Sequence, residues 1–169
     1  NEPLVDYSYM YGDFEYKQYP RTLLSLKMLE ELKDRAEKVN LSDLHYAMTD
    51  KRIYLAELLV DDLVDRCQRY PEYELDGETI QLSQACAILD KWDRKANLDS
   101  VGTHLFREYA FLSQILQYVH GCEEQCWSKP FDPNTPLTTP SGLPEVADPT
   151  NDIHLAALAN AVRLMNHAD

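Results

Sequence analysis

Residues 53–67, with the sequence IYLAELLVDDLVDRC, decide the fold class of this 169-residue chain. Apolar residues recur there every three or four positions, with acidic residues between them, which is the pattern of an amphipathic helix. The stripe ends before Pro71, and the Asp76-Gly77 pair beyond it marks a turn. The segment is therefore predicted to be a helix that buries one face against neighbouring helices. That face comprises Ile53, Leu55, Ala56, Leu59, Leu63 and Val64.

The same spacing on both sides of this stretch predicts a chain that is mainly α, with about six helices. The first helix begins at Pro20, because proline suits a first helical turn. The expected helices are residues 20–39, 44–48, 53–70, 80–92, 100–121 and 151–169. The expected N-caps are Ser42 or Asp43, Thr49 or Asp50, Asp99 or Ser100, and Asn151 or Asp152.

Two segments are predicted to lack regular structure. Residues 1–20 carry five tyrosines without a sustained period, so we expect an extended arm that packs on these helices or on a missing neighbour. Six of the nine prolines lie in residues 130–149, which predicts a long, pinned loop before the last helix. The chain thus divides into the arm (1–20), a helical core (21–121), a Cys- and Pro-rich loop (122–150) and a C-terminal helix (151–169), all within one domain.

The charge of the chain limits its partners. Sixteen Lys and Arg residues against 29 Asp and Glu residues give a formal net charge of −13. So acidic a surface repels phosphates, which argues against a nucleic-acid partner. No apolar run reaches the roughly 18 to 20 residues of a membrane span, and no signal peptide opens the chain. The first residue is Asn1 rather than Met, and we interpret it as a boundary at which a targeting signal can have been lost.

Four cysteines allow three interpretations. Antiparallel helices joined by the turn after Pro71 would bring Cys67 close to Cys86, and Cys122 lies one helical turn from Cys126. Two disulfides would indicate an oxidising compartment. Buried free thiols are the second interpretation. A metal site of His120, Cys122 and Cys126 is the third, although it has no obvious fourth ligand.

Spacing alone assembles no active site in this chain. It contains no G-x-S-x-G motif, phosphate-binding glycine loop or H-E-x-x-H motif. The five histidines are scattered, and we interpret each as a surface or half-buried residue. The carboxylates near Asp93 lack the order of a calcium loop, and no base lies near Ser100 in the sequence.

Several motifs resemble the penicillin acylase (penicillin amidase) family, most closely its acyl-homoserine lactone acylase and aculeacin acylase branch. They extend over essentially the whole chain in the order found in that family. They comprise Pro3-Leu4, Tyr7-Ser8, Pro20-Arg21, residues 85–94 (ACAILDKWDR), residues 96–102 (ANLDSVG) with Phe106, residues 127–132 (WSKPFD), Pro136-Leu137 and residues 139–143 (TPSGL).

The resemblance implies that this chain is the helical section of the β subunit of an N-terminal-nucleophile hydrolase. Members of the family cleave amides with the amino-terminal serine of the mature β subunit, whose α-amine acts as the base. The resemblance places that serine and the oxyanion-hole asparagine before Asn1, outside this chain. One supporting site position carries over, Arg21, which in the family orders the asparagine and the reacting centre. The alternative is a helix-start arginine that neutralises local acids.

The resemblance also implies the partners of the chain and its location. The partners are the remainder of the β subunit, the α subunit of the processed precursor and a small N-acyl substrate, in a periplasmic or secreted protein. No cofactor and no metal are expected here, and a structural calcium in the parent enzyme cannot be assigned to these residues. The Cys122/Cys126 pair departs from the pattern of many members, which leaves that bridge open. A different hypothesis is a non-catalytic helical module whose tyrosine arm binds a protein.

Overall fold

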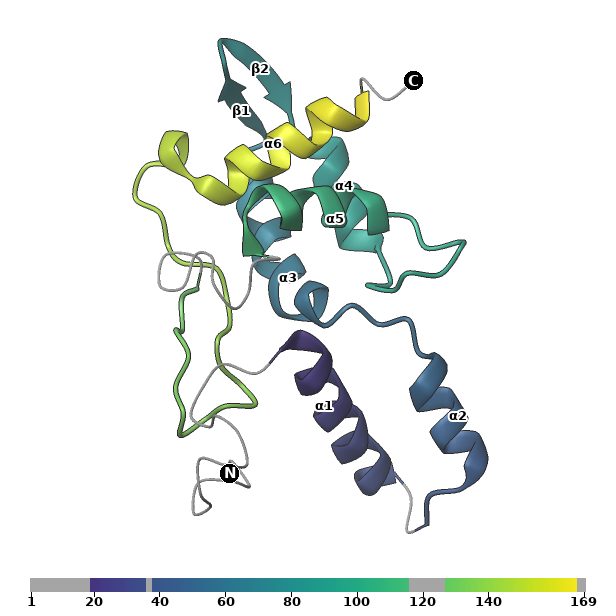
Figure 1. Ribbon diagram of the computed structural model, residues 1–169. Coiled ribbons are helices and arrows are strands. Elements are labelled where there is room, and N and C mark those ends of the chain that lie inside the picture. Colours follow the sequence, from purple (N-terminus) through teal and green to yellow (C-terminus); the bar gives the residue numbers. More distant parts are fainter. Residues whose placement is uncertain (1–18, 36–37, 116–126, 167–169) are drawn as a thin grey trace.

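The structure is a computed structural model that describes residues 19–35, 38–115 and 127–166 (Figure 1). Over these residues the chain is mainly α, as predicted, with six α-helices and one two-stranded antiparallel sheet. The elements are α1 (Pro20–Arg35), α2 (Leu41–Thr49), α3 (Tyr54–Arg69), β1 (Glu72–Leu75), β2 (Glu78–Gln81), α4 (Ser83–Lys91), α5 (Thr103–Leu112), the 3-10 turn η3 (Pro149–Asn151) and α6 (Ile153–Asn166).

The main hydrophobic core lies among α3, α4, α5 and α6 (Figure 1). The apolar face predicted for residues 53–67 is the centre of it, since Ala56, Leu59 and Leu63 are completely buried. Side chains in or beside α4, α5 and α6 complete this core, and they come from distant parts of the sequence. They include Leu82, Cys86, Leu89, Trp92, Phe106, Tyr109, Leu155 and Leu158.

Helices α1 and α2 lie beside this core and contribute no residue to it (Figure 1). Helix α1 buries Leu23, Met28 and Leu32, whereas α2 buries none of its residues. The difference matters below, because a nine-residue helix depends on tertiary packing for its stability.

A β-hairpin corrects the prediction for residues 72–81. Ile80 was expected in a helix, but it lies in β2 and pairs with Tyr73 of β1. Asp76 and Gly77 both have positive φ, 54° and 82°, as a two-residue hairpin turn requires. The Tyr73 hydroxyl donates to the Thr150 carbonyl at 2.9 Å, which attaches the hairpin to the segment before α6.

Three of the four expected helix caps are wrong. Asn40, rather than Ser42 or Asp43, caps α2, and Asp43 completes a capping box as its third residue. Helix α3 begins after Ile53 and α5 after Gly102, neither with a side-chain cap. Asp152 does cap α6, because its Oδ1 accepts from the backbone N–H of His154 at 2.8 Å and of Leu155 at 3.3 Å.

The proline-rich segment is a pinned loop, as predicted, over residues 127–150. Lys129 and Ser141 form an antiparallel bridge across it. Trp127 and Leu143 are buried in the main core, and the Asp62 carboxylate accepts from the Leu143 N–H at 2.9 Å. The loop is therefore fixed to α3 by both apolar and polar contacts.

The predicted disulfide between Cys67 and Cys86 is present, with the two Cα atoms 6.0 Å apart. It joins the end of α3 to α4 across the hairpin. Residues 1–18 of the expected tyrosine arm lie outside the described residues, as do His120, Cys122 and Cys126. Pro20, the last residue of that arm, is the first residue of α1. Among the helices that are described, none has the length and apolar character needed to cross a bilayer.

Candidate functional site

Arg21 lies in the first turn of α1, at one end of a groove between α1, α2 and the start of α3. Within the described part of the chain, its guanidinium makes no hydrogen bond and no ion pair, so the side chain is not neutralising a local acid there. The groove has a volume of about 800 Å³. Apolar side chains form most of its walls: Leu24, Met28, Leu29, Leu44, Ala47, Met48, Ile53 and Leu55.

A chain of ion pairs joins α1 to α3 beside this groove. Glu57 of α3 accepts from Arg52 Nε at 2.5 Å and from Lys27 Nζ at 2.6 Å, and Arg52 reaches Glu31 of α1 at 2.7 Å. Burial alone would raise the pKa of Glu57, but the hydrogen bonds from Arg52 and Lys27 outweigh it and lower this pKa. The hydrogen bond from Arg52 also lowers the pKa of Glu31. Both carboxylates therefore remain ionised and hold α1 in place.

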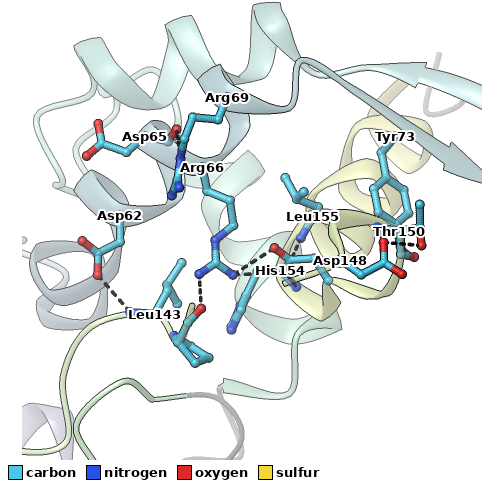
Figure 2. A network of polar contacts seen from close by, with 12 residues as sticks. Asp62, Asp65, Arg66, Arg69, Tyr73, Leu143, Asp148, Thr150, His154 and Leu155 are labelled. Carbon is cyan, nitrogen blue, oxygen red and sulfur yellow. Dashed lines mark hydrogen bonds and ion pairs between the residues drawn. The ribbon is translucent and has the colours of Figure 1, made fainter. Parts of the chain in front are cut away.

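A second polar network is buried between α3, α6 and the proline-rich loop (Figure 2). Arg66 of α3 is 5% exposed and Asp152 is 1% exposed. Arg66 Nη1 lies 3.1 and 3.0 Å from the two carboxylate oxygens of Asp152, and its Nη2 donates to the Pro144 carbonyl. Asp152 thus neutralises Arg66 and caps α6 with the same carboxylate, which ties three separate segments together.

His154 extends this network into the main core. Its ring is completely buried, and its Nδ1 lies 2.9 Å from the Tyr109 hydroxyl of α5. Nε2 is buried and has no hydrogen-bond partner within the described residues. Burial first, and then the positive charge of Arg66, lower the pKa of His154 to about 4, although Asp152 opposes the shift. His154 is therefore neutral near pH 7, and burial keeps the Tyr109 hydroxyl protonated by raising its pKa.

This buried network is suited to holding helices rather than to catalysis. Arg66 and Asp152 are paired with each other, and each makes a further hydrogen bond to the backbone of a neighbouring segment. No group of three or more His, Cys, Asp or Glu side chains that could hold a metal ion occurs within residues 19–35, 38–115 and 127–166. Ser100 Oγ donates to the exposed Asp93 carboxylate at 3.0 Å, a contact that belongs to the loop between α4 and α5.

The geometry of the described residues does not identify a protein family, but similarity to known proteins does. The family model for penicillin amidase matches residues 1–169. The chain belongs to the penicillin amidase family. Acyl-homoserine lactone acylase PvdQ of Pseudomonas syringae pv. tomato is 28% identical over 172 residues, which cover 99% of this chain and 21% of that protein. PvdQ of Pseudomonas fluorescens is 33% identical over 109 residues, covering 64% of this chain and 13% of that protein.

A similar match joins the chain to a second kind of acylase. Aculeacin-A acylase of Actinoplanes utahensis is 33% identical over 114 residues, which cover 67% of this chain and 13% of that protein. The chain thus spans from about one eighth to one fifth of the length of these curated relatives. Most of any parent protein of this size lies outside these 169 residues.

The strongest penicillin amidase motif in the chain, residues 85–102, forms the corner between α4 and α5. The Trp92 ring is buried, and its Nε1 donates to the Lys95 carbonyl at 3.0 Å. Gly102 has a φ of 126°, and a Cβ there would lie 2.7 Å from Trp92 Cγ. The Asp93 carboxylate closes the loop by accepting from Ser100 Oγ and from the Lys95 N–H. The motif therefore packs a loop, which explains its residue types without any catalytic role.

Sequence reasoning located some of these residues and missed others. It named Arg21 and the Cys67–Cys86 pair, which lie in different parts of the molecule. It interpreted His154 as a surface or half-buried residue, which is wrong because the ring is completely buried. It also missed Arg66, and it named Asp152 as a helix cap but not as the partner of Arg66, which lies 86 residues away in the sequence. The available sequence signal for Arg66 was its position on the helix that carries the apolar stripe of residues 53–67.

Proposed function

We propose that the parent protein of this chain hydrolyses the amide bond of N-acyl substrates and that these 169 residues form the helical section of its β subunit. The observation that carries the proposal is the match of the whole chain to the penicillin amidase model. Relatives named as acylases support it, since both PvdQ and aculeacin-A acylase carry that activity in their names. Acyl-homoserine lactones, lipopeptides and penicillin-like amides are the substrate classes that we propose.

The proposed nucleophile is an N-terminal serine outside this chain. Its hydroxyl would attack the acyl carbonyl while the α-amine of the same residue accepts the proton. The tetrahedral intermediate would collapse with loss of the amine, which takes up that proton. Water would then cleave the acyl-serine ester and release the carboxylic acid.

Arg21 is proposed as a positioning residue for that centre. Its guanidinium is unpaired within the described residues, and it stands at the first turn of α1, where the chain enters the helical section. A buried charged hydrogen bond contributes about 1.5–3 kcal/mol. If Arg21 makes such a bond to the oxyanion-hole region in the parent enzyme, its loss would lower kcat about 10- to 100-fold.

The Cys67–Cys86 disulfide supports a periplasmic or secreted location. Disulfides persist in oxidising compartments and are rare in the cytosol. The bridge closes a loop with a sequence separation of 19 residues, so it stabilises the α3–α4 pair by about 3 kcal/mol on the loop-entropy estimate. A non-reducing mass measurement on protein isolated from its native compartment tests this location.

The test of the proposed function is an amidase assay on the purified parent protein, with N-terminal sequencing of its subunits. We expect an N-terminal serine on the subunit that contains these residues, and release of fatty acid or amine from an N-acyl substrate. Replacement of that serine by alanine should abolish turnover. An active protein that starts with another residue would contradict the proposed nucleophile.

Variants at position 21 test the positioning role in the same assay. Arg21→Ala should lower kcat with little change in KM and in the unfolding temperature, and Arg21→Lys should recover part of the loss. Lys33→Ala, an exposed cation in the last turn of the same helix, is the matched control and should leave kcat unchanged. Equal kcat values for Arg21→Ala and Lys33→Ala would remove Arg21 from the site.

A further inference from the structure

The exposed apolar side chains of this chain are concentrated on α1 and α2 and the segments beside them. Of the fourteen large apolar side chains that are exposed in the described residues, eight lie between Tyr19 and Met48. Two of them are among the most exposed of all, Leu41 at 83% and Met48 at 86%. The eight are Tyr19, Leu26, Leu29, Val39, Leu41, Leu44, Tyr46 and Met48.

Three of these side chains line the groove between α1, α2 and the start of α3. Leu44 and Met48 form its α2 wall, and Leu29 lies on its α1 wall. Leu41, Leu44 and Met48 are spaced by three and four positions, so they form one stripe along α2. An exposed, continuous apolar surface of this kind marks a site of interaction.

The described residues give helix α2 little packing. It has nine residues, buries none of them and contributes nothing to the main core. Its attachments are a capping box at Asn40 and an ion pair between Arg35 and Asp43 at 2.9 Å. Helices of this length are marginal in water without packing of an apolar face.

We infer that the groove is covered by another segment of the same parent polypeptide, outside residues 1–169, that presents an apolar ridge to Leu44 and Met48. This inference rests on the proposed function, because it takes the chain to be one section of a longer acylase. The length of the relatives supports this occupant, since the chain covers only 13–21% of them and leaves most of the polypeptide available for packing.

Charge argues against the other occupants of such a surface. The chain carries a net charge of −13, so anionic lipid headgroups repel it. A second copy carries the same charge, and association of two copies would bring these charges together. A segment tethered in the same polypeptide has a high effective concentration and needs only modest affinity to stay bound.

Site-specific photo-crosslinking of the full-length parent protein tests the inference. A benzophenone side chain is introduced at Met48, and at Ser42 as a control that is exposed on the same helix and does not line the groove. After irradiation, we expect the position-48 probe to be joined to a peptide of the same polypeptide outside residues 1–169, and the position-42 probe to give no such product. If the protein substituted at Met48 fails to accumulate, Leu44, which also lines the groove, serves as the probe position.

Two results would overturn the inference. Equal, negligible crosslinking at both positions would mean that the groove is open to water. Crosslinks between residues 1–169 of differently isotope-labelled copies would identify a second copy as the occupant. The amidase assay separates this inference from the proposed function. Crosslinking at position 48 without amidase activity would contradict only the proposed function. Amidase activity without crosslinking would contradict only the inference that the groove is covered.

Discussion

The main core and the α1–α2 segment bury their apolar side chains to very different extents. Ala56, Leu59 and Leu63 of α3 are completely buried by helices of this chain, whereas α2 buries no residue. Polar contacts differ in the same way, because Arg66 and Asp152 form a buried pair and the ion pairs of α1 are partly exposed. Within the described residues, the main core therefore buries its apolar side chains, and the α1–α2 segment leaves most of its own exposed.

Asp152→Ala should have the largest effect of the variants considered, and it acts on the main core. It leaves the Arg66 guanidinium buried without a partner and removes the cap of α6. Breaking a buried ion pair lowers the free energy of unfolding by about 3–5 kcal/mol. Urea unfolding of the 169-residue chain measures this change. Asp65→Ala, which removes an exposed carboxylate from α3, should change stability by less than about 0.5 kcal/mol. Equal effects of the two variants would mean that the pair does not stabilise the core.

A matched pair of alanine substitutions compares the two regions directly. Leu59→Ala should lower the free energy of unfolding by about 2–5 kcal/mol, because it creates a cavity in a completely buried position. Met48→Ala should lower that of the isolated chain by less than about 0.5 kcal/mol, because Met48 is 86% exposed. In the parent protein the Met48 variant should have a larger effect, because Met48 lines the covered groove. Equal effects in the two proteins would argue that nothing covers the groove.

Acid should weaken the core through His154, with Arg66, Asp152 and Tyr109 as its charged and titratable neighbours. The pKa of His154 is about 4 in the folded chain, below its ordinary value of 6.5. Between these pH values the unfolded state binds a proton that the folded state does not, so stability falls as the pH is lowered from about 6.5 to about 4. The loss attributable to His154 is at most about 3 kcal/mol. His154→Gln should reduce the dependence of the urea midpoint on pH in this window. An unchanged dependence would mean that groups other than His154 cause it.

The smallest expected effect concerns the attachment of α1. Arg52→Ala removes the shared partner of Glu31 and Glu57. Because these ion pairs are partly exposed, their loss should lower the free energy of unfolding by about 1 kcal/mol. Hydrogen exchange should become faster in α1 and stay unchanged in α5 and α6. Uniform acceleration through all helices would indicate that the two regions unfold together.

Local patterns in the sequence account for the parts of the fold that were predicted correctly. The stripe in residues 53–67 has a helical period and lies at the centre of the core, and the cluster of prolines forms the pinned loop. The hairpin at residues 72–81 was missed because the Asp76-Gly77 turn was recognised without its two flanking strands. Each strand has only four residues, too few for a period of two to stand out beside the helical pattern of α4.

The polar network could not be predicted because its members meet only in the folded chain. Arg66 and Asp152 are separated by 86 residues, and Tyr109 and His154 by 45. No spacing rule relates such positions. Arg21 was named through resemblance to a family rather than through its spacing, and its role remains a proposal. Its guanidinium has no partner among the described residues, and it lines the apolar groove that we propose another segment of the parent protein covers.

Hydrogen exchange measured on the parent protein compares α2 with α3 most directly. If another segment of the polypeptide covers the groove, amides in the last turn of α2, around Met48, should be protected to a degree similar to those of α3 around Leu59. Rapid exchange throughout α2, with α3 still protected, would contradict the account. The apolar face of α2 would then be exposed in the parent protein as well.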